Sequence, residues 1–123
     1  TDQSGDVAAE LRRGHQLFSN GEEAAARAVF DALLERNDLS VSERAEALQG
    51  RAATKANAGD YQGADEDFAA AIATGALAEG RADELDYYRA QSKLARGDYQ
   101  GAIEGFEDYI AKRPDDAQAR YLN

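Results

Sequence analysis

The chain has no cysteine, methionine or tryptophan, and only one proline and one histidine among its 123 residues. The absence of cysteine excludes disulfides and thiolate metal sites, and it leaves the redox compartment open. The single histidine, His15, has no cysteine with which it can build the usual zinc site. No apolar run approaches the roughly 20 residues that a membrane-spanning helix requires. We therefore expect no metal, no cofactor and no membrane span.

Side-chain sets that carry out catalysis are also absent. Nothing in the sequence resembles a nucleophile with its base, a phosphate-cradling glycine loop or a paired acid. Asp65, Glu66 and Asp67 are adjacent, as are Glu107 and Asp108. Adjacent residues on a helix point in different directions, so these acids are predicted to be solvated outer faces rather than a metal site. The sequence predicts a protein that is not an enzyme.

Basic residues are few: 14 Lys and Arg stand against 24 Asp and Glu, which gives a net charge of −10. This balance argues against nucleic-acid binding, because basic residues are needed to displace counterions from phosphates. It argues equally against a polybasic membrane anchor. The acid excess either keeps the chain soluble, which we favour, or indicates a basic partner.

The chain contains an internal repeat. The segment at 59–64, GDYQGA, recurs unchanged at 97–102, and a degraded copy, GEEAAA, occupies 21–26. The starting positions are evenly spaced, since 59 − 21 and 97 − 59 are both 38. Self-similarity at a fixed period of this size predicts a stacked repeat protein. We expect a single domain over 1–123, with units at about 2–38, 39–76 and 77–114 and a helix at 115–123.

The predicted secondary structure is entirely helical, because glycine and proline fall between stretches of helical periodicity. Ser40 and Glu43 predict a capping box, and Asp60 and Asp98 predict caps after the turns at Gly59 and Gly97. The expected helices are at about 6–19, 22–36, 41–58, 61–74, 81–96 and 99–113, followed by a short segment at 117–122.

A column of phenylalanines recurs with the repeat at Phe30, Phe68 and Phe106, each four residues after an alanine. This spacing places both side chains on one helix face, which neighbouring units bury on stacking. Because Phe68 lies in the middle unit, we expect its loss to cost more stability than the loss of either outer phenylalanine.

These residues resemble the tetratricopeptide repeat, through the Gly-Asp-Tyr turns, the Ala-x-x-x-Phe helices and Pro114 at the exit. The resemblance implies an all-α fold, a right-handed α-solenoid of three helix-turn-helix pairs plus a short C-terminal capping helix. It also implies that the first helix of each pair lines a concave groove.

The chain departs from the family pattern in two ways. Each unit has four residues more than the family's usual length, and Arg13, Arg51 and Arg89 replace a packed leucine. Longer units with this arginine are similar to a subset of bacterial repeat proteins, many of them exported. An exported or periplasmic location is therefore favoured over a cytoplasmic one.

The role of these three arginines has two interpretations. They form either a ladder of guanidinium groups for a carboxylate or phosphate ligand, or ion pairs with acids on neighbouring helices such as Glu66 or Glu104. We favour the ion pairs.

From the resemblance, the peptide-binding groove is expected to use side chains from all three units. They are Leu11, His15, Phe18, Gln49, Ala53, Ala56, Asn57, Tyr87, Tyr88, Gln91 and Leu94. Tyr87 fits a core position equally well. The basic clamp with which some members of the family bind chaperone tails is absent, because the matching positions carry Leu11, His15, Gly50, Glu84 and Tyr88.

The function expected from this fold is a protein–protein interaction scaffold that binds a peptide or a helical segment of a partner in the groove. One alternative is a self-assembling or dimerising module, a homo-oligomer formed through the C-terminal helix. Another is a tetratricopeptide-repeat segment of a larger cell-envelope protein.

Overall fold

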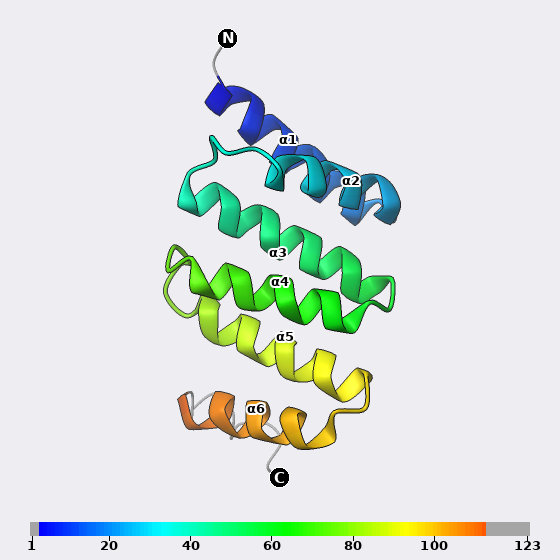
Figure 1. Ribbon diagram of the computed structural model, residues 1–123, viewed down its shortest axis with the longest axis vertical. Helices are drawn as coiled ribbons and strands as arrows, with labels where there is room; N and C mark the ends of the chain where they lie inside the picture. Colours follow the sequence, from blue (N-terminus) through cyan, green and yellow to red (C-terminus); the bar gives the residue numbers. More distant parts are fainter. Residues whose placement is uncertain (1–2, 113–123) are drawn as a thin grey trace.

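The computed structural model describes residues 3–112, and over this range it contains six helices and no strand. The helices are α1 (Gln3–Ser19), α2 (Glu23–Leu34), α3 (Val41–Asn57), α4 (Tyr61–Ala73), α5 (Arg81–Ala95) and α6 (Tyr99–Lys112). Figure 1 shows them stacked in chain order along the long axis of the molecule. The predicted all-α fold is thus confirmed. The segment predicted as a short helix at 117–122 lies outside the described residues.

Each helix packs against its neighbours in the chain, and α1 also contacts α3. The pairs α1–α2, α3–α4 and α5–α6 correspond to the three sequence repeats (Figure 1). Helix pairs that touch only adjacent pairs are the defining arrangement of a solenoid.

The predicted helix caps form as expected. Ser40 begins α3 with a capping box: the Glu43 amide donates to Ser40 Oγ at 3.0 Å, and the Ser40 amide donates to Glu43 Oε1 at 2.8 Å. Asp60 and Asp98 each accept a hydrogen bond from the amide three residues later, at 3.0 Å. Gly59 and Gly97 both have φ of +90°, a conformation that side chains disfavour, so these turns are built for glycine.

The longer loop between α2 and α3 is held by two arginines. Arg36 pairs with Asp38 at 2.7 Å, and this hydrogen bond lowers the pKa of the Asp38 carboxyl. Arg44 reaches back from α3 and donates to the carbonyl of Arg36 at 2.9 Å. That contact satisfies a carbonyl just beyond the end of α2, where no intrahelical partner is available.

The buried side chains form two clusters. The first joins α1, α2 and α3 and contains Val7, Leu11, Ala26, Val29, Phe30, Leu33 and Ala47. The second joins α3, α4 and α5 and contains Leu48, Ala52, Ala64, Phe68, Ala71 and Leu85. Leu34 packs against both clusters, so it connects the first two units into one core.

Phe30 is the side chain around which the first cluster is packed. It is fully buried, whereas Phe68 is 5% exposed and Phe106 is only half-buried. A methyl group added at Gly14 would lie 2.7 Å from the Phe30 ring, and one added at Gly50 would lie 2.4 Å from it. The ring therefore fills space that two glycines, on α1 and α3, leave open. Because Phe30 rather than Phe68 is the most deeply buried of the three, we revise the expected ranking and place the largest loss of stability at Phe30.

Candidate functional site

An open cavity of about 540 Å³ lies along α3 and α5, with contributions from α1 and α4. We call it the groove. Its lining residues are Phe18, Gln49, Ala53, Ala56, Asn57, Tyr61, Phe68, Arg81, Tyr88, Gln91, Ser92 and Ala95. Most residues predicted from the resemblance therefore do line one surface.

The groove combines an aromatic wall with side-chain amides. Phe68 and Tyr88 lie with ring centroids 5.8 Å apart, and neither ring is fully covered. Asn57 donates to Glu23 at 3.0 Å, which leaves its carbonyl oxygen as an acceptor. Gln91 is exposed, and its side chain forms no hydrogen bond within the part of the chain that the structure describes. Its donor and acceptor groups are both available to a ligand.

Arg81 is the one basic side chain in the lining of the groove, and sequence reasoning missed it. It donates to Gln49 at 2.7 Å and to Glu84 at 2.7 Å, and its guanidinium lies 5.8 Å from the centre of the Tyr88 ring. These contacts connect the start of α5 to α3 and orient Tyr88. No arginine recurs 38 residues before Arg81, where the chain has Glu43, so the repeat pattern gave no signal for it.

A smaller cavity of about 200 Å³ extends this surface towards α1. It shares Phe18, Gln49, Ala53 and Arg81 with the groove, and it adds His15 and Glu46 among its other lining residues. The His15 ring lies 3.0 Å from the Glu46 carboxylate and 5.3 Å, between centroids, from the Phe30 ring. His15 therefore lies in the smaller cavity, next to the groove.

Three predicted groove residues do not line either cavity. Leu11 is 5% exposed and belongs to the first core cluster. Tyr87 packs edge-on against Phe106 and also contacts Tyr109, with centroids 5.4 and 5.0 Å away. Leu94 is exposed, at 48%, but lies outside both cavities.

The error on α5 has a simple geometric cause. The groove-facing stripe includes residues 81, 88, 91, 92 and 95, whereas the predicted stripe followed 87, 91 and 94. Successive helical residues are rotated by about 100°, so a shift of one position moves a side chain from the groove to the interface with α6. Tyr87 consequently packs at the interface between α5 and α6.

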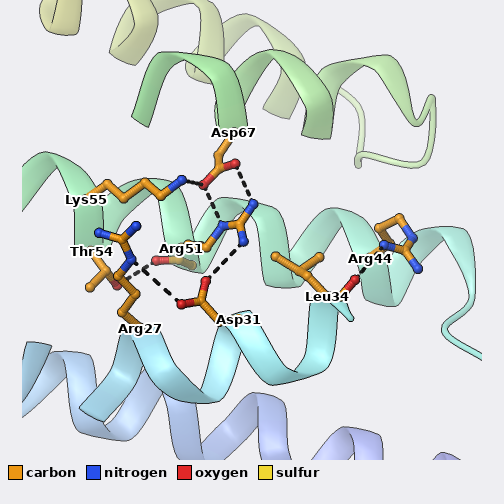
Figure 2. A network of polar contacts seen from close by, with 9 residues as sticks. Arg27, Asp31, Leu34, Arg44, Arg51, Thr54, Lys55 and Asp67 are labelled. Carbon is orange, nitrogen blue, oxygen red and sulfur yellow. Dashed lines mark hydrogen bonds and ion pairs between the residues drawn. The ribbon is translucent and has the colours of Figure 1, made fainter. Parts of the chain in front are cut away.

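All three repeated arginines form ion pairs, and those of Arg51 and Arg89 are with acids on neighbouring helices, the arrangement that we favoured. Arg51 has the fullest set: it holds Asp67 with two hydrogen bonds of 2.8 and 2.9 Å and Asp31 with one of 3.0 Å (Figure 2). Lys55 approaches the same Asp67 carboxylate at 3.0 Å. The hydrogen bonds that Arg51 donates to Asp67 raise the pKa of Arg51 above its already high value. This network joins α2, α3 and α4.

Two details of the prediction are wrong. The partners are not Glu66 and Glu104: Arg89 donates to Asp65 at 2.9 Å, and Arg13 pairs with Glu10 on its own helix at 3.1 Å. Asp67 is 5% exposed rather than solvated. Asp65 contacts Arg89, and Asp67 contacts Arg51 and Lys55. The Asp67 carboxylate can be buried because these two cations compensate its charge.

The described residues contain neither a cluster of metal ligands nor a helix that could span a membrane. No three acidic or histidine side chains come together as a metal site within residues 3–112. None of the helices described in that range is both long and apolar enough to cross a bilayer.

The same arrangement of helices occurs in a solved structure. The chain is similar to the crystal structure of the TPR domain of Arabidopsis FLU, with a TM-score of 0.81 and 22% sequence identity. The match covers 90% of this chain and 97% of that one. Protein-family models and curated proteins give no match to the sequence. The chain therefore has the tetratricopeptide-repeat fold, an α-solenoid, as its sequence motifs predicted.

Proposed function

We propose that this chain is a protein-interaction module that binds a peptide or a helical segment of a partner in the groove. The observation that carries the proposal is the composition of the groove itself. Aromatic rings, small alanines and amides with free hydrogen-bonding groups line a cavity of about 540 Å³, and no acid lines it although the chain's net charge is −10. Such a mixture of apolar surface and a few polar groups is typical of binding sites.

The lining suggests how a peptide is held. Tyr88, packed against the buried Phe68, offers ring surface for one large apolar side chain, and Ala53 and Ala56 leave room for it. The free groups of Asn57 and Gln91 suit a peptide backbone, which presents one donor and one acceptor per residue. Recognition of this kind depends on a few central contacts.

Replacement of Tyr88 tests the proposal. Tyr88→Ala removes ring surface from the groove, while the 38% exposure of this side chain limits the loss of stability. We expect the affinity for the partner to fall by more than about tenfold, measured by titration calorimetry with a partner captured on the wild-type chain. The matched control is Tyr99→Ala, which removes the same group from α6, where Tyr99 is 64% exposed and outside the groove. Equal affinity in both variants would contradict the assignment.

A second candidate function is self-association, and the exposed apolar face of α6 favours it. Tyr99 is 64% exposed and Ile103 is 50% exposed, one turn apart on the last described helix. Sedimentation equilibrium measures this directly: self-association predicts a mass that rises with protein concentration and falls to that of a monomer in Ile103→Asp. A monomer mass at all concentrations excludes this candidate.

A further inference from the structure

A separate cavity of about 320 Å³ lies in the crevice between α5 and α6. Its lining residues are Asp86, Arg89, Ala90, Lys93, Gly101, Glu104, Gly105, Asp108 and Lys112. None of them lines the groove, so the two surfaces are distinct.

The internal repeat shows what this crevice lacks. Arg51 and Lys55 of the second unit recur 38 residues later as Arg89 and Lys93. In the second unit these two cations hold the Asp67 carboxylate at 2.8 to 3.0 Å (Figure 2). The residue 38 positions after Asp67 is Gly105, which has no side chain. The third unit therefore keeps the two cations without the carboxylate.

The contacts of the two cations agree with this comparison. The Nε of Arg89 donates to Asp65 at 2.9 Å, and its Nη1 lies 3.8 Å from Asp86, beyond hydrogen-bonding distance. Lys93 forms no ion pair with any residue in the range 3–112. The second unit uses two guanidinium hydrogen bonds and one ammonium group on Asp67. In the third unit Asp65 takes the Nε of Arg89, and Lys93, which lines the cavity, is the cation without a carboxylate partner in the described range.

The helix packing explains why the chain does not fill this position. A Cβ atom at Gly105 would lie 2.9 Å from the Cβ of Ala90, closer than carbon atoms pack. The glycine lets α6 approach α5 here, and the space beside it stays open. Position 105 therefore supplies no acceptor to Arg89 and Lys93.

We propose that this crevice is a second binding site, which takes the carboxylate of an aspartate or glutamate side chain presented by a partner protein. A carboxylate is the group that the equivalent cations, Arg51 and Lys55, hold in the second unit, and charge-assisted hydrogen bonds from a cation to a carboxylate are among the stronger ones in proteins.

The charges around the site decide between ligands. Three cations and three carboxylates line the cavity. Asp86 pairs with Lys112 at 3.4 Å, Glu104 accepts from Gln100 at 3.1 Å, and Asp108 forms no ion pair within the described range. This balanced lining, on a chain of net charge −10, disfavours a free polyvalent anion. A single carboxylate positioned by a larger docked surface fits it better.

The test uses acetate as the probe and NMR of the intact chain as the measurement. Titration with sodium acetate is expected to shift the Lys93 ammonium signal and the Gly101 and Gly105 amides in a saturable way, while sodium chloride at equal ionic strength does not. The signal of Lys55, the equivalent lysine of the second unit, should stay unchanged, since its ammonium group already contacts Asp67. No acetate-specific shift, or an equal shift at Lys55, overturns the proposal.

Two glycine variants provide matched controls. Gly105→Asp supplies the missing carboxylate within the chain and should abolish the acetate response, whereas Gly105→Ala has the same Cβ crowding and should retain it. Lys93→Gln should weaken the apparent affinity for acetate about tenfold. A response that persists in Gly105→Asp contradicts the proposal. So does a response that appears only in Asp108→Asn, because Asp108 would then fill the site.

Discussion

Phe30→Ala is expected to lower the free energy of unfolding by about 3–5 kcal/mol, the usual range for a buried phenylalanine. The ring is fully buried and fills the space left by Gly14 and Gly50, so its removal opens a cavity between α1, α2 and α3. Neither glycine has a side chain that can move in to close it. In a chain of this size such a loss is a large part of the total stability. Urea denaturation followed by circular dichroism measures it.

Phe106→Ala is the matched control, because it removes the same group from the same repeat position. Phe106 is only half-buried, so we expect its loss to cost clearly less. The converse change should also destabilise: Gly50→Ala would push a methyl group into the Phe30 ring and cost about 1–3 kcal/mol. If Phe106→Ala costs as much as Phe30→Ala, the first cluster is not the better packed part of the solenoid.

Asp67→Asn is expected to cost about 2–4 kcal/mol, the second large effect. The Asp67 side chain is 7% exposed, and the change would leave Arg51 and Lys55 facing each other without their shared carboxylate. Removing one partner of a buried ion pair is costly because the remaining charge stays desolvated. We place the expected loss in free energy of unfolding slightly below the range for a fully buried ion pair. The reason is that the Arg51 side chain is 24% exposed, so water screens part of its charge.

The control for this change is Glu10→Gln, which breaks the Arg13–Glu10 pair. Both of those side chains are exposed, at 60% and 41%, so the expected cost is below about 1 kcal/mol. Equal costs for Glu10→Gln and Asp67→Asn would show that the Asp67 network is no stronger than a surface pair. Raised salt concentration should weaken the exposed pair more than the buried one.

The features that the sequence predicted correctly depend on residues close together in the chain. The capping box at Ser40, the caps at Asp60 and Asp98 and the turn glycines are local, and each has a short signature. The helices and the repeat fold followed from these signatures and from the spacing of 38 residues.

The features that it missed depend on contacts between helices. The predicted groove stripe on α5 was shifted by one residue. It therefore included Tyr87, which packs against α6, and it missed Arg81, which lines the groove. Asp67 is polar in sequence but buried in the fold, because Arg51 and Lys55 approach it from the preceding helix. The depth of Phe30 depends on Gly50, which is distant in sequence and does not recur in the repeat.

Site-specific photo-crosslinking tests the central proposal, binding in the groove, most directly. A photoreactive phenylalanine analogue placed at Gln91, which is exposed in the groove, should form a covalent adduct with the partner in a native lysate. The same analogue at Glu107, which is exposed on α6 outside the groove, should not. An adduct at Glu107 without one at Gln91 would contradict the groove as the binding surface.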